Sequence, residues 1–582
     1  MCSMTRSLDD HCMPKQVQES AAPPIMTIER SGTPCAGRVD AVEVSRQVGA
    51  RRILQKLSLS IEPAELVAIA GGSGAGKTTL LEILAGLQPP SSGEVRHDGV
   101  VCGTRTRSDS RIGYVPQDDI IHLEMPLRRT LRYAARLRLP AGTSAAEADR
   151  IVEETMDDLD LADRAEVAVR ALSGGQRKRA SIAVELLTRP RLFFLDEPTS
   201  GLDPSTAADV MRLLRRLTQR GVTVVLTTHE PAGIDQCDRV VFLARDGHLA
   251  FTGSPTEARR YFDVNDLADV YVRLAVEHTP QVWAKRFAGS RGKFGDRPVP
   301  ARHPLSATRS DVERASVIRQ WWLLTRRNVD VLLRNRLTLA VLLGSPVLVT
   351  AMVATLFNRG ASEPHNAADL APAQIVFWIA FAGFFFGLTY GLLQIVGEMA
   401  VFRRERLAGL SVGAYVASKV TALLPVLAGV SVVLLGVLRV LGRLPAVGWH
   451  VYALLFVTIV IEATSALALG LLASAAVSTP AQAALALPML CFPQVLFGGA
   501  IVPVDQMAAP GRLMSHVLAN RHAFEALGRD LDLDRYTATL PAMSAYRTTF
   551  QGGAGASLIM LASFAVVLTL ATVWVLDRRS RR

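Results

Sequence analysis

Cysteine is scarce in this chain, and its few cysteines show no pairing pattern. Six are present among 582 residues: Cys2, Cys12, Cys35, Cys102, Cys237 and Cys491. No two of them form a CxxC pair, so the sequence indicates neither a zinc site nor a disulfide framework. We expect free thiols in a reducing compartment.

Acidic residues are outnumbered by basic ones, 53 against 64, which gives a formal net charge of +11. A basic balance can indicate nucleic-acid binding, but the arginines here are scattered or lie beside apolar runs. We interpret most of them as residues that flank membrane spans and keep the protein soluble, and we predict no nucleic-acid partner.

Long uncharged runs are missing up to about residue 335 and are frequent after it. Residues 1–38 hold no continuous apolar stretch, so they do not resemble a secretory signal peptide; their composition predicts a disordered tail. A chain of this length favours two or more domains. Residues 39–265 alternate short apolar strands with helical segments, which predicts an α/β domain.

A glycine-rich loop follows the apolar run "LVAIA" (66–70) and precedes a helix that begins near Lys77. The loop matches G-x-x-x-x-G-K-[ST], in which backbone N–H groups surround a β-phosphate at a helix N-terminus. Lys77 would reach the β- and γ-phosphates, and the Thr78 hydroxyl would ligate Mg²⁺. Kinases, GTPases and motors share such a loop. The residues predicted to hold the nucleotide are Gly71, Gly72, Ser73, Gly74, Ala75, Gly76, Lys77, Thr78 and Thr79.

A second apolar strand, "LFFLDEP", ends in Asp196 and Glu197. The carboxyl ends of parallel strands are where α/β sheets place their ligands. We predict that Asp196 holds Mg²⁺ through water and that Glu197 orients or deprotonates the attacking water. Without the glycine-rich loop upstream, the same acidic pair could simply cap a turn.

Between these two motifs lies "LSGGQRKRASIAVELL" (172–187), which predicts a second helix N-terminus suited to phosphate. Because one nucleotide rarely needs two such sites in one chain, this motif is the most specific clue. The sequence here resembles the ATP-binding cassette (ABC) family, whose signature motif is LSGGQ. The resemblance implies that two cassettes pair head to tail and that the signature residues cover the ATP of the partner cassette. These residues are Ser173, Gly174, Gly175 and Gln176.

The same resemblance assigns roles to three further residues. Gln117 in "YVPQDD" matches the glutamine that contacts Mg²⁺ and senses the membrane domain; Asp203 in "SGLD" matches the residue at the cassette interface. His229, after "VVLTT", matches the histidine that contacts the γ-phosphate. The stretch 42–54, where many cassettes carry an adenine-stacking aromatic residue, has none. The choice of ATP therefore follows from the resemblance, and the adenine contact stays open.

The second half predicts a helical membrane domain, because about 20 apolar residues cross a bilayer as a helix. Residues 463–504 carry no charge at all and must hold parts of two helices, with "STPAQ" (478–482) as the turn. An all-α domain of six spans follows in 337–582. The expected spans are about 337–357, 373–396, 420–438, 451–475, 482–502 and 553–576.

Basic clusters before the first span, between spans two and three, and at the C-terminus predict a cytoplasmic cassette and cytoplasmic termini. The first cluster includes Arg334 and Arg336; Arg439 and Arg443 are an exception that would lie outside. We expect the cell inner (plasma) membrane, with 505–552 as a long external loop.

The order of cassette and membrane domain resembles the G-type (White-family) half-transporters and their bacterial relatives. The stretches that carry this match are 115–140, 397–419 and 496–507. By resemblance, 311–336 is an amphipathic connecting helix after a linker at 266–310, and "FRRERLAGL" is a coupling helix seated on the cassette. Without the resemblance, the sequence of 311–336 predicts an amphipathic helix at the membrane interface, anchored by its Trp residues. The basic residues of "FRRERLAGL" could likewise be the positive charges that flank a membrane span on its cytoplasmic side.

Glu462 lies about a dozen residues into the fourth span, where an ionisable group is costly. One explanation is that Glu462 contacts the substrate or a proton. The alternative is that it makes a structural hydrogen bond or that the helix starts at a different residue. The aromatic residues of the spans suggest an apolar or amphipathic cargo, although lipid-facing packing explains them as well.

The sequence therefore predicts an ATP-hydrolysing exporter that uses Mg²⁺ and works as a homodimer, because both halves of the ATP site are intact. A membrane-embedded regulatory or assembly ATPase is the alternative. The membrane spans argue against a soluble translation or repair ATPase. Bacterial importers usually carry the cassette and the membrane domain on separate chains.

Overall fold

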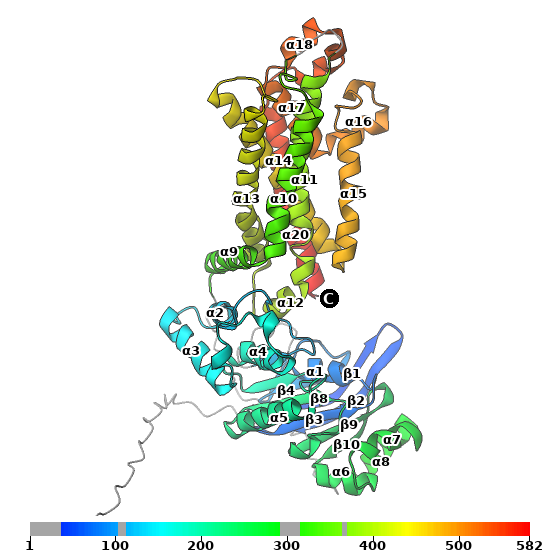
Figure 1. The fold of residues 1–582 in the computed structure, drawn as a ribbon. Helices are drawn as coiled ribbons and strands as arrows, with labels where there is room; N and C mark the ends of the chain where they lie inside the picture. Colours follow the sequence, from blue (N-terminus) through cyan, green and yellow to red (C-terminus); the bar gives the residue numbers. More distant parts are fainter. Residues whose placement is uncertain (1–36, 103–111, 291–314, 364–368, 582) are drawn as a thin grey trace, which may run out of the picture. The chain divides into compact units, whose positions relative to one another are not determined.

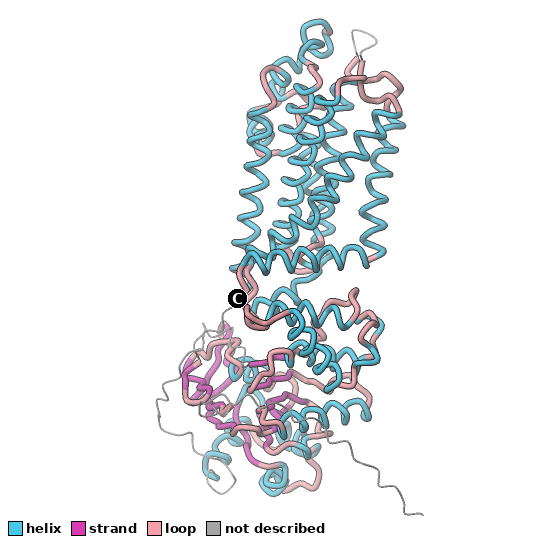
Figure 2. The backbone as a smooth tube through the Cα atoms, turned by 90° about the vertical axis from the view of Figure 1, so that its left-hand side faces the viewer, coloured by secondary structure: helices cyan, strands magenta, loops and turns pink. Residues whose placement is uncertain are grey.

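The computed structural model describes residues 37–102, 112–290, 315–363 and 369–581. The tail expected at 1–38 lies almost entirely outside the described residues. The described residues all belong to one unit of the chain, Gly37–Arg582. An α/β cassette forms its N-terminal part and a helical bundle forms its C-terminal part, as expected (Figures 1 and 2).

The cassette contains two sheets. A four-stranded antiparallel sheet has the order β2-β1-β4-β5, and a six-stranded sheet has the order β10-β9-β3-β8-β7-β6, in which only β10 runs antiparallel. The strands are β1 (Val39–Val48), β2 (Arg51–Ile61), β3 (Leu66–Gly71), β4 (Ser92–His97), β5 (Val100–Val101), β6 (Ile112–Val115), β7 (Leu192–Leu195), β8 (Thr223–Thr228), β9 (Arg239–Ala244) and β10 (His248–Gly253).

The central strands are buried and mostly apolar. Strands β3, β7, β8 and β9 are buried along their whole length, as parallel strands usually are. The helices of this half are α1 (Lys77–Leu84), α2 (Leu127–Arg138), α3 (Ala145–Asp158), α4 (Gly174–Leu186) and α5 (Pro204–Gln219).

The cassette extends past residue 265, where a linker was expected. After α6 (Pro255–Phe262), the described part of 266–310 forms α7 (Ala268–Val276) and α8 (Pro280–Ser290). Trp283 and Phe287 of α8 are buried, and their rings pack against Phe251 and Phe262. The apolar face of α8 completes the cassette core, so the linker prediction was wrong for 268–290.

The bundle contains five helices long and apolar enough to cross a membrane, by length and composition, within the described residues. Helices α10, α11, α13, α14 and α20 run side by side in Figures 1 and 2. Helix α9 precedes them, and the short α12 lies between α11 and α13. The bounds of these helices are α9 (Val317–Arg334), α10 (Arg336–Leu356), α11 (Ala371–Leu392), α12 (Met399–Leu407), α13 (Val412–Val440), α14 (Trp449–Ala476) and α20 (Gly555–Arg581).

The helix at the position of the fifth expected span is shorter than predicted. Helix α15 (Pro480–Leu496) has 17 residues and ends six residues before the expected Val502. Two prolines lie inside it, and Gly499 just beyond it has a φ of 90°, which takes the chain out of the helix.

Residues 505–552 are mostly helical and not the long loop that we expected. They form α16 (Ala509–His516), α17 (Ala519–Asp530), α18 (Asp534–Thr539) and α19 (Arg547–Phe550). Helix α17 is largely buried and contacts α11, α14 and α20. Its burial explains why the segment folds, because a loop cannot satisfy its backbone groups in such surroundings.

Helices α11 and α14 approach each other unusually closely. Gly383, Gly387 and Gly391 recur every fourth residue on α11 and face α14. A Cβ at Gly387 would overlap the carbonyl oxygen of Ala463, and one at Gly391 would lie 2.6 Å from the carbonyl oxygen of Leu467. Small residues at this spacing let two helix backbones pack in direct contact.

Candidate functional site

The glycine-rich loop lies between β3 and α1, as the sequence predicts. Gly76 is the N-cap of α1 with a φ of 89°, and it packs so closely on β2 that a Cβ would lie 2.9 Å from the Ile53 carbonyl oxygen. The N-cap makes no side-chain hydrogen bond, and the first turn has no acidic residue. The first amides of α1 are therefore open to an anion.

Lys77 folds back over this loop. Its Nζ donates hydrogen bonds to the carbonyl oxygens of Gly71 at 2.9 Å and Gly72 at 3.2 Å. Burial lowers the pKa of Lys77, an effect that Glu197 and Asp196 oppose. The lysine is thus held beside the loop with the two acids near enough to act on its charge.

Asp196 follows β7 and is held from two sides. The hydroxyls of Thr78, on α1, and Thr227, on β8, both donate to its Oδ1, at 3.1 and 2.5 Å. Parallel pairing of β7 with β8 brings these groups together. The Thr78 hydroxyl and the Asp196 carboxylate lie side by side, as expected for two oxygen groups that serve one cation.

Glu197 is the meeting point of the predicted catalytic residues. Its Oε2 accepts a hydrogen bond from Gln117 Nε2 at 3.0 Å and lies 3.1 Å from His229 Nδ1. Its backbone has a φ of 45°, a left-handed conformation that glutamate rarely adopts and that can be maintained at active sites. The Thr227 hydroxyl accepts a hydrogen bond from the Glu197 N–H at 2.9 Å, which supports this turn.

These residues fit a nucleotide with its magnesium ion. The uncapped N-terminus of α1 and Lys77 match phosphate groups, and Thr78, Asp196 and Gln117 supply oxygen ligands of the kind that Mg²⁺ prefers. Within the described residues no group of three or more His, Cys, Asp or Glu side chains could hold a metal alone. Phosphate oxygens would therefore complete the coordination, as is usual for Mg²⁺.

The signature motif begins helix α4. Ser173 is its N-cap and forms a capping box with Gln176, whose side chain accepts from the Ser173 N–H at 3.1 Å. Ser173 and Gly174 are exposed. In the described part of the chain no hydrogen bond joins 173–176 to the loop at 71–79. This protomer therefore assembles the loop, the acids, Gln117 and His229, and leaves Ser173 and Gly174 of the signature exposed.

Gly175 fixes the signature helix to α5. A Cβ at Gly175 would overlap the Thr206 side chain, whereas one at Gly174 would lie 3.8 Å from Leu202, an ordinary contact. We expect Gly175→Ala to destabilise this contact by about 1–3 kcal/mol, the usual cost of overpacking. The measurement is the apparent Tm of the full chain. Gly174→Ala is the control and should leave Tm unchanged; equal Tm values for both variants would contradict the packing argument.

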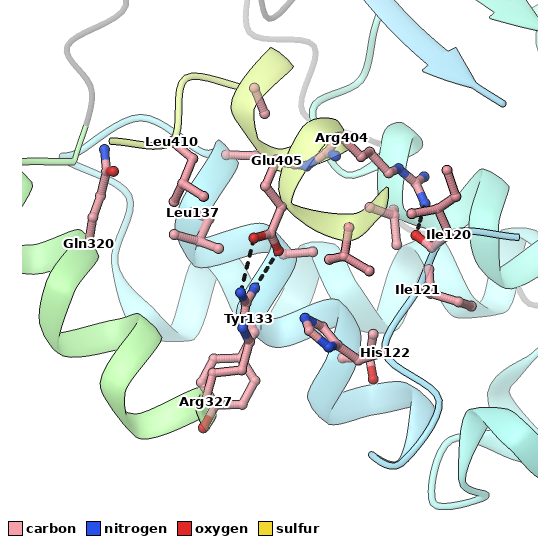
Figure 3. A pocket seen from close by; sticks show the side chains of 16 residues that line it. Ile120, Ile121, His122, Tyr133, Leu137, Gln320, Arg327, Arg404, Glu405 and Leu410 are labelled. Carbon is pink, nitrogen blue, oxygen red and sulfur yellow. Dashed lines mark hydrogen bonds and ion pairs between the residues drawn. The ribbon is translucent and has the colours of Figure 1, made fainter. Parts of the chain in front are cut away.

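One arginine of α12 connects the helical bundle with the cassette. Arg404 is 7% exposed, and its Nε donates to Glu185 of α4 at 2.8 Å. Its other nitrogens donate to the carbonyl oxygens of Ser181 and Ile120, each at 2.7 Å. Burial raises the pKa of Glu185, but Arg138 and Arg404 outweigh it and lower the pKa overall. The coupling-helix sequence thus contacts both the signature helix and the segment after Gln117 (Figure 3).

A second ion pair lines a small cavity that Arg404 also lines. Arg327 of α9 makes a two-pronged pair with Glu405 of α12, as Figure 3 shows. His122 points toward the pair, and burial with the nearby Arg327 lowers its pKa to about 4, so His122 is neutral at neutral pH. The cavity of about 30 Å³ has room for about one water molecule.

Sequence reasoning missed several residues of this site. Thr227 and Lys178 come from a strand and a helix whose motifs were recognised, but their contacts depend on how the strands and helices pack. Glu185 is the partner of Arg404 and of Arg138. A glutamate on the mostly apolar second half of α4 was the available signal, since a buried acid needs a cation.

The loop, the acidic strand end and the signature helix define a P-loop nucleotide-binding cassette. Family models confirm and refine this: residues 54–200 match the model for "ABC transporter" and residues 319–528 match the model for "ABC-2 type transporter". The chain belongs to the ABC transporters, with an ATP-binding cassette fused to an ABC-2 type membrane domain in one polypeptide.

Relatives include proteins from bacteria, plants and insects. An ABC transporter ATP-binding/permease protein of Mycobacterium tuberculosis is 34% identical over 494 residues, 83% of this chain and 56% of the relative. ABC transporter G family member 22 of Arabidopsis thaliana is 37% identical over 222 residues, 36% of this chain and 29% of the relative. Protein scarlet of Drosophila melanogaster is 37% identical over 223 residues, 36% of this chain and 33% of the relative.

The chain thus spans about half of the mycobacterial relative and about a third of the other two. Among solved structures, CbiO1 of Clostridium perfringens, part of the ABC transporter complex CbiONQ, aligns with 25% identity. The alignment covers 42% of this chain and 96% of that chain, with a TM-score of 0.36.

Proposed function

We propose that this protein is an ATP-driven exporter that works as a homodimer and moves an apolar or amphipathic cargo across the membrane. The observation that carries the proposal is the constellation around Glu197, where Gln117 and His229 converge on one carboxylate beside the phosphate loop. Its residues supply every group that hydrolysis requires from one cassette.

The chain's own residues have separate roles in this reaction. The amides of 71–79 and Lys77 bind the β- and γ-phosphates, while Glu197 holds the attacking water and takes up its proton. His229 and Gln117 keep Glu197 in place through its Oε2. When bound through Thr78, Asp196 and Gln117, Mg²⁺ supplies charge neutralisation on the phosphates.

A second copy of the chain completes each ATP site. Ser173 and Gly174 are exposed at the N-terminus of α4, a position that favours a phosphate group even though a capping box holds this helix start. Because both sets of residues are intact in this chain, a homodimer has two complete sites. The partner prediction therefore rests on the exposed signature residues and the family resemblance.

Arg404 supports coupling between hydrolysis and transport. It bridges α12 to the signature helix and to the segment that follows Gln117. Closure of two cassettes around ATP would displace these elements together and so move α12. The basic residues near the ends of the spans favour a cytoplasmic cassette and cytoplasmic termini in the plasma membrane.

The test is reconstitution of the purified full chain in proteoliposomes, with ATPase and cargo uptake measured together. We expect Mg²⁺-dependent hydrolysis that an apolar or amphipathic ligand stimulates, and ATP-dependent accumulation of that ligand inside vesicles. Hydrolysis that no ligand stimulates, with no accumulation, would instead support a regulatory or assembly ATPase.

Glu462 is the candidate for a cargo or proton contact in the bundle. It is 0% exposed in α14, and both of its carboxylate oxygens have no hydrogen-bond partner within the described residues. A Cβ at Gly383 of α11 would lie 3.3 Å from its Oε2. The side chain is thus fully enclosed at the seam between α11 and α14.

We expect Glu462→Gln to keep the fold, because glutamine has the same shape, but to lower transport and change its pH dependence. A neutral amide cannot take up or release a proton and is a weaker acceptor for a cationic group. The measurement is the transport rate between pH 5 and pH 8 beside the wild-type protein. An unchanged rate and pH profile would leave Glu462 a purely structural residue.

A further inference from the structure

Lys178 of helix α4 is a buried cation whose contacts neither the motifs nor the family models assign. Its side chain is almost fully enclosed, with the residue 4% exposed. Its Nζ donates to the carbonyl oxygen of Gln117 at 2.7 Å and pairs with Asp119 Oδ1 at 3.2 Å. A lysine is rarely buried unless it is paired, so these two contacts determine where its charge lies.

The contacts of Lys178 connect two parts of the ATP site. The Gln117 side chain donates to Glu197, while the Gln117 carbonyl oxygen accepts from Lys178. Lys178 lies on the same helix as the signature residues, which the capping box and the Gly175 contact hold rigidly. One residue therefore fixes the position of Gln117 relative to the start of α4.

The segment after Gln117 is held from the other end as well. Arg404 donates to the Ile120 carbonyl oxygen and to Ser181, and it pairs with Glu185. Lys178, Ser181 and Glu185 are spaced three and four residues apart, so they share one face of α4. Residues 117–120 thus lie between two cations that are both anchored on that face.

We infer that Lys178 is a positioning residue for ATP hydrolysis, which holds the main chain of Gln117 against the signature helix so that the Gln117 side chain reaches Glu197. The inference rests on the proposed function, because it assigns Lys178 to that same site. Movement of α4 when the partner's ATP binds is then passed to Gln117 and from there to the general base. Lys178 acts through Gln117 and does not touch the nucleotide.

The first measurement is hydrogen exchange of the full chain in lipid nanodiscs. Lys178→Met keeps the length and apolar stem of the side chain but removes the donor. We expect the amides of residues 117–121 to exchange faster than in the wild-type protein. Lys285→Met, the same substitution at an exposed position of α8, is the matched control and should leave these amides unchanged. Unchanged exchange at 117–121 in Lys178→Met would overturn the inference.

The second measurement is ATPase activity. We expect Lys178→Met to lower kcat about tenfold or more, with little change in KM for ATP, and Lys178→Arg to recover part of the rate. In a Gln117→Ala background Lys178→Met should have no further effect on kcat, because its route of action is already gone. If Lys178→Met lowers kcat in the Gln117→Ala background by the same factor as in the wild-type protein, Lys178 does not act through Gln117 and its role is only structural.

The two measurements separate this inference from the proposed function. A wild-type protein that hydrolyses no ATP would contradict the proposed function, while hydrogen exchange would still decide whether Lys178 holds the Gln117 segment. An active wild-type protein with an equally active Lys178→Met variant would overturn only the inference.

Discussion

Replacing Glu197 with glutamine is expected to leave ATP binding intact and to lower the ATPase rate about 10²- to 10⁴-fold. The amide keeps the shape of the side chain and its contact with Gln117, but it cannot accept the proton of the attacking water. The variant should therefore accumulate as a dimer closed around ATP, measured by retained nucleotide and by cross-linking of two copies.

The control is Glu147→Gln, the same substitution at an exposed position of α3, which should keep the wild-type ATPase rate. If Glu197→Gln hydrolyses ATP at close to the wild-type rate, Glu197 is not the general base. If it loses ATP binding altogether, the carboxylate is needed to build the site, and the role proposed for it is wrong.

Replacing Arg404 with methionine is expected to separate hydrolysis from movement of the membrane domain. Arg404 is buried, and without it the Ser181 and Ile120 carbonyl oxygens lose a donor and Glu185 keeps only Arg138. Breaking a buried ion pair by removing one partner costs about 3–5 kcal/mol. Part of the ATPase activity should persist because Lys178 still holds the Gln117 carbonyl oxygen, and among the described residues no hydrogen bond or ion pair joins Arg404 to the loop at 71–79.

Because the cargo is unidentified, coupling is measured by the change that ATP causes in amide exchange of α11 and α14 in lipid nanodiscs. We expect this change in the wild-type protein and its loss in Arg404→Met. Arg403→Met, at the exposed neighbouring position of α12, should respond like the wild-type protein. An unchanged response in Arg404→Met would show that another contact transmits the signal.

Much of the cassette could be predicted from sequence because its motifs lie at strand ends. Once β3, β7 and β8 are recognised as parallel strands, their carboxyl ends must share an edge, which brings Lys77, Asp196 and His229 together. Lys178 and Glu185 could not be placed in the same way. Their role comes from which face of α4 meets the Gln117 segment and α12, which depends on tertiary packing.

In the helical bundle, hydropathy predicts the long apolar helices but not the buried helix α17. Uncharged runs predicted the positions of the long helices, and α14 begins at Trp449, two residues before the expected start at about 451. The charged and polar stretch after residue 505 hid α17, because its burial depends on Asn520, His522 and Glu525 finding partners inside the bundle. A hydropathy scale gives a polar residue the same value whether it is buried with a hydrogen-bond partner or exposed to water. It therefore cannot predict that such a residue is buried.

The glycine seam between α11 and α14 has a consequence for the route of any cargo. At Gly387 and Gly391 the two backbones are already in contact, so not even a methyl group fits between them. A molecule cannot pass between these two helices at Gly387 and Gly391, whereas at Gly383, one turn away, the nearest atoms of α14 are the side chains of Ile459 and Glu462. If the protein moves a cargo as proposed, other faces of the protomer are open to it, and among these α15 exposes Leu485, Met489 and Phe492 along one side.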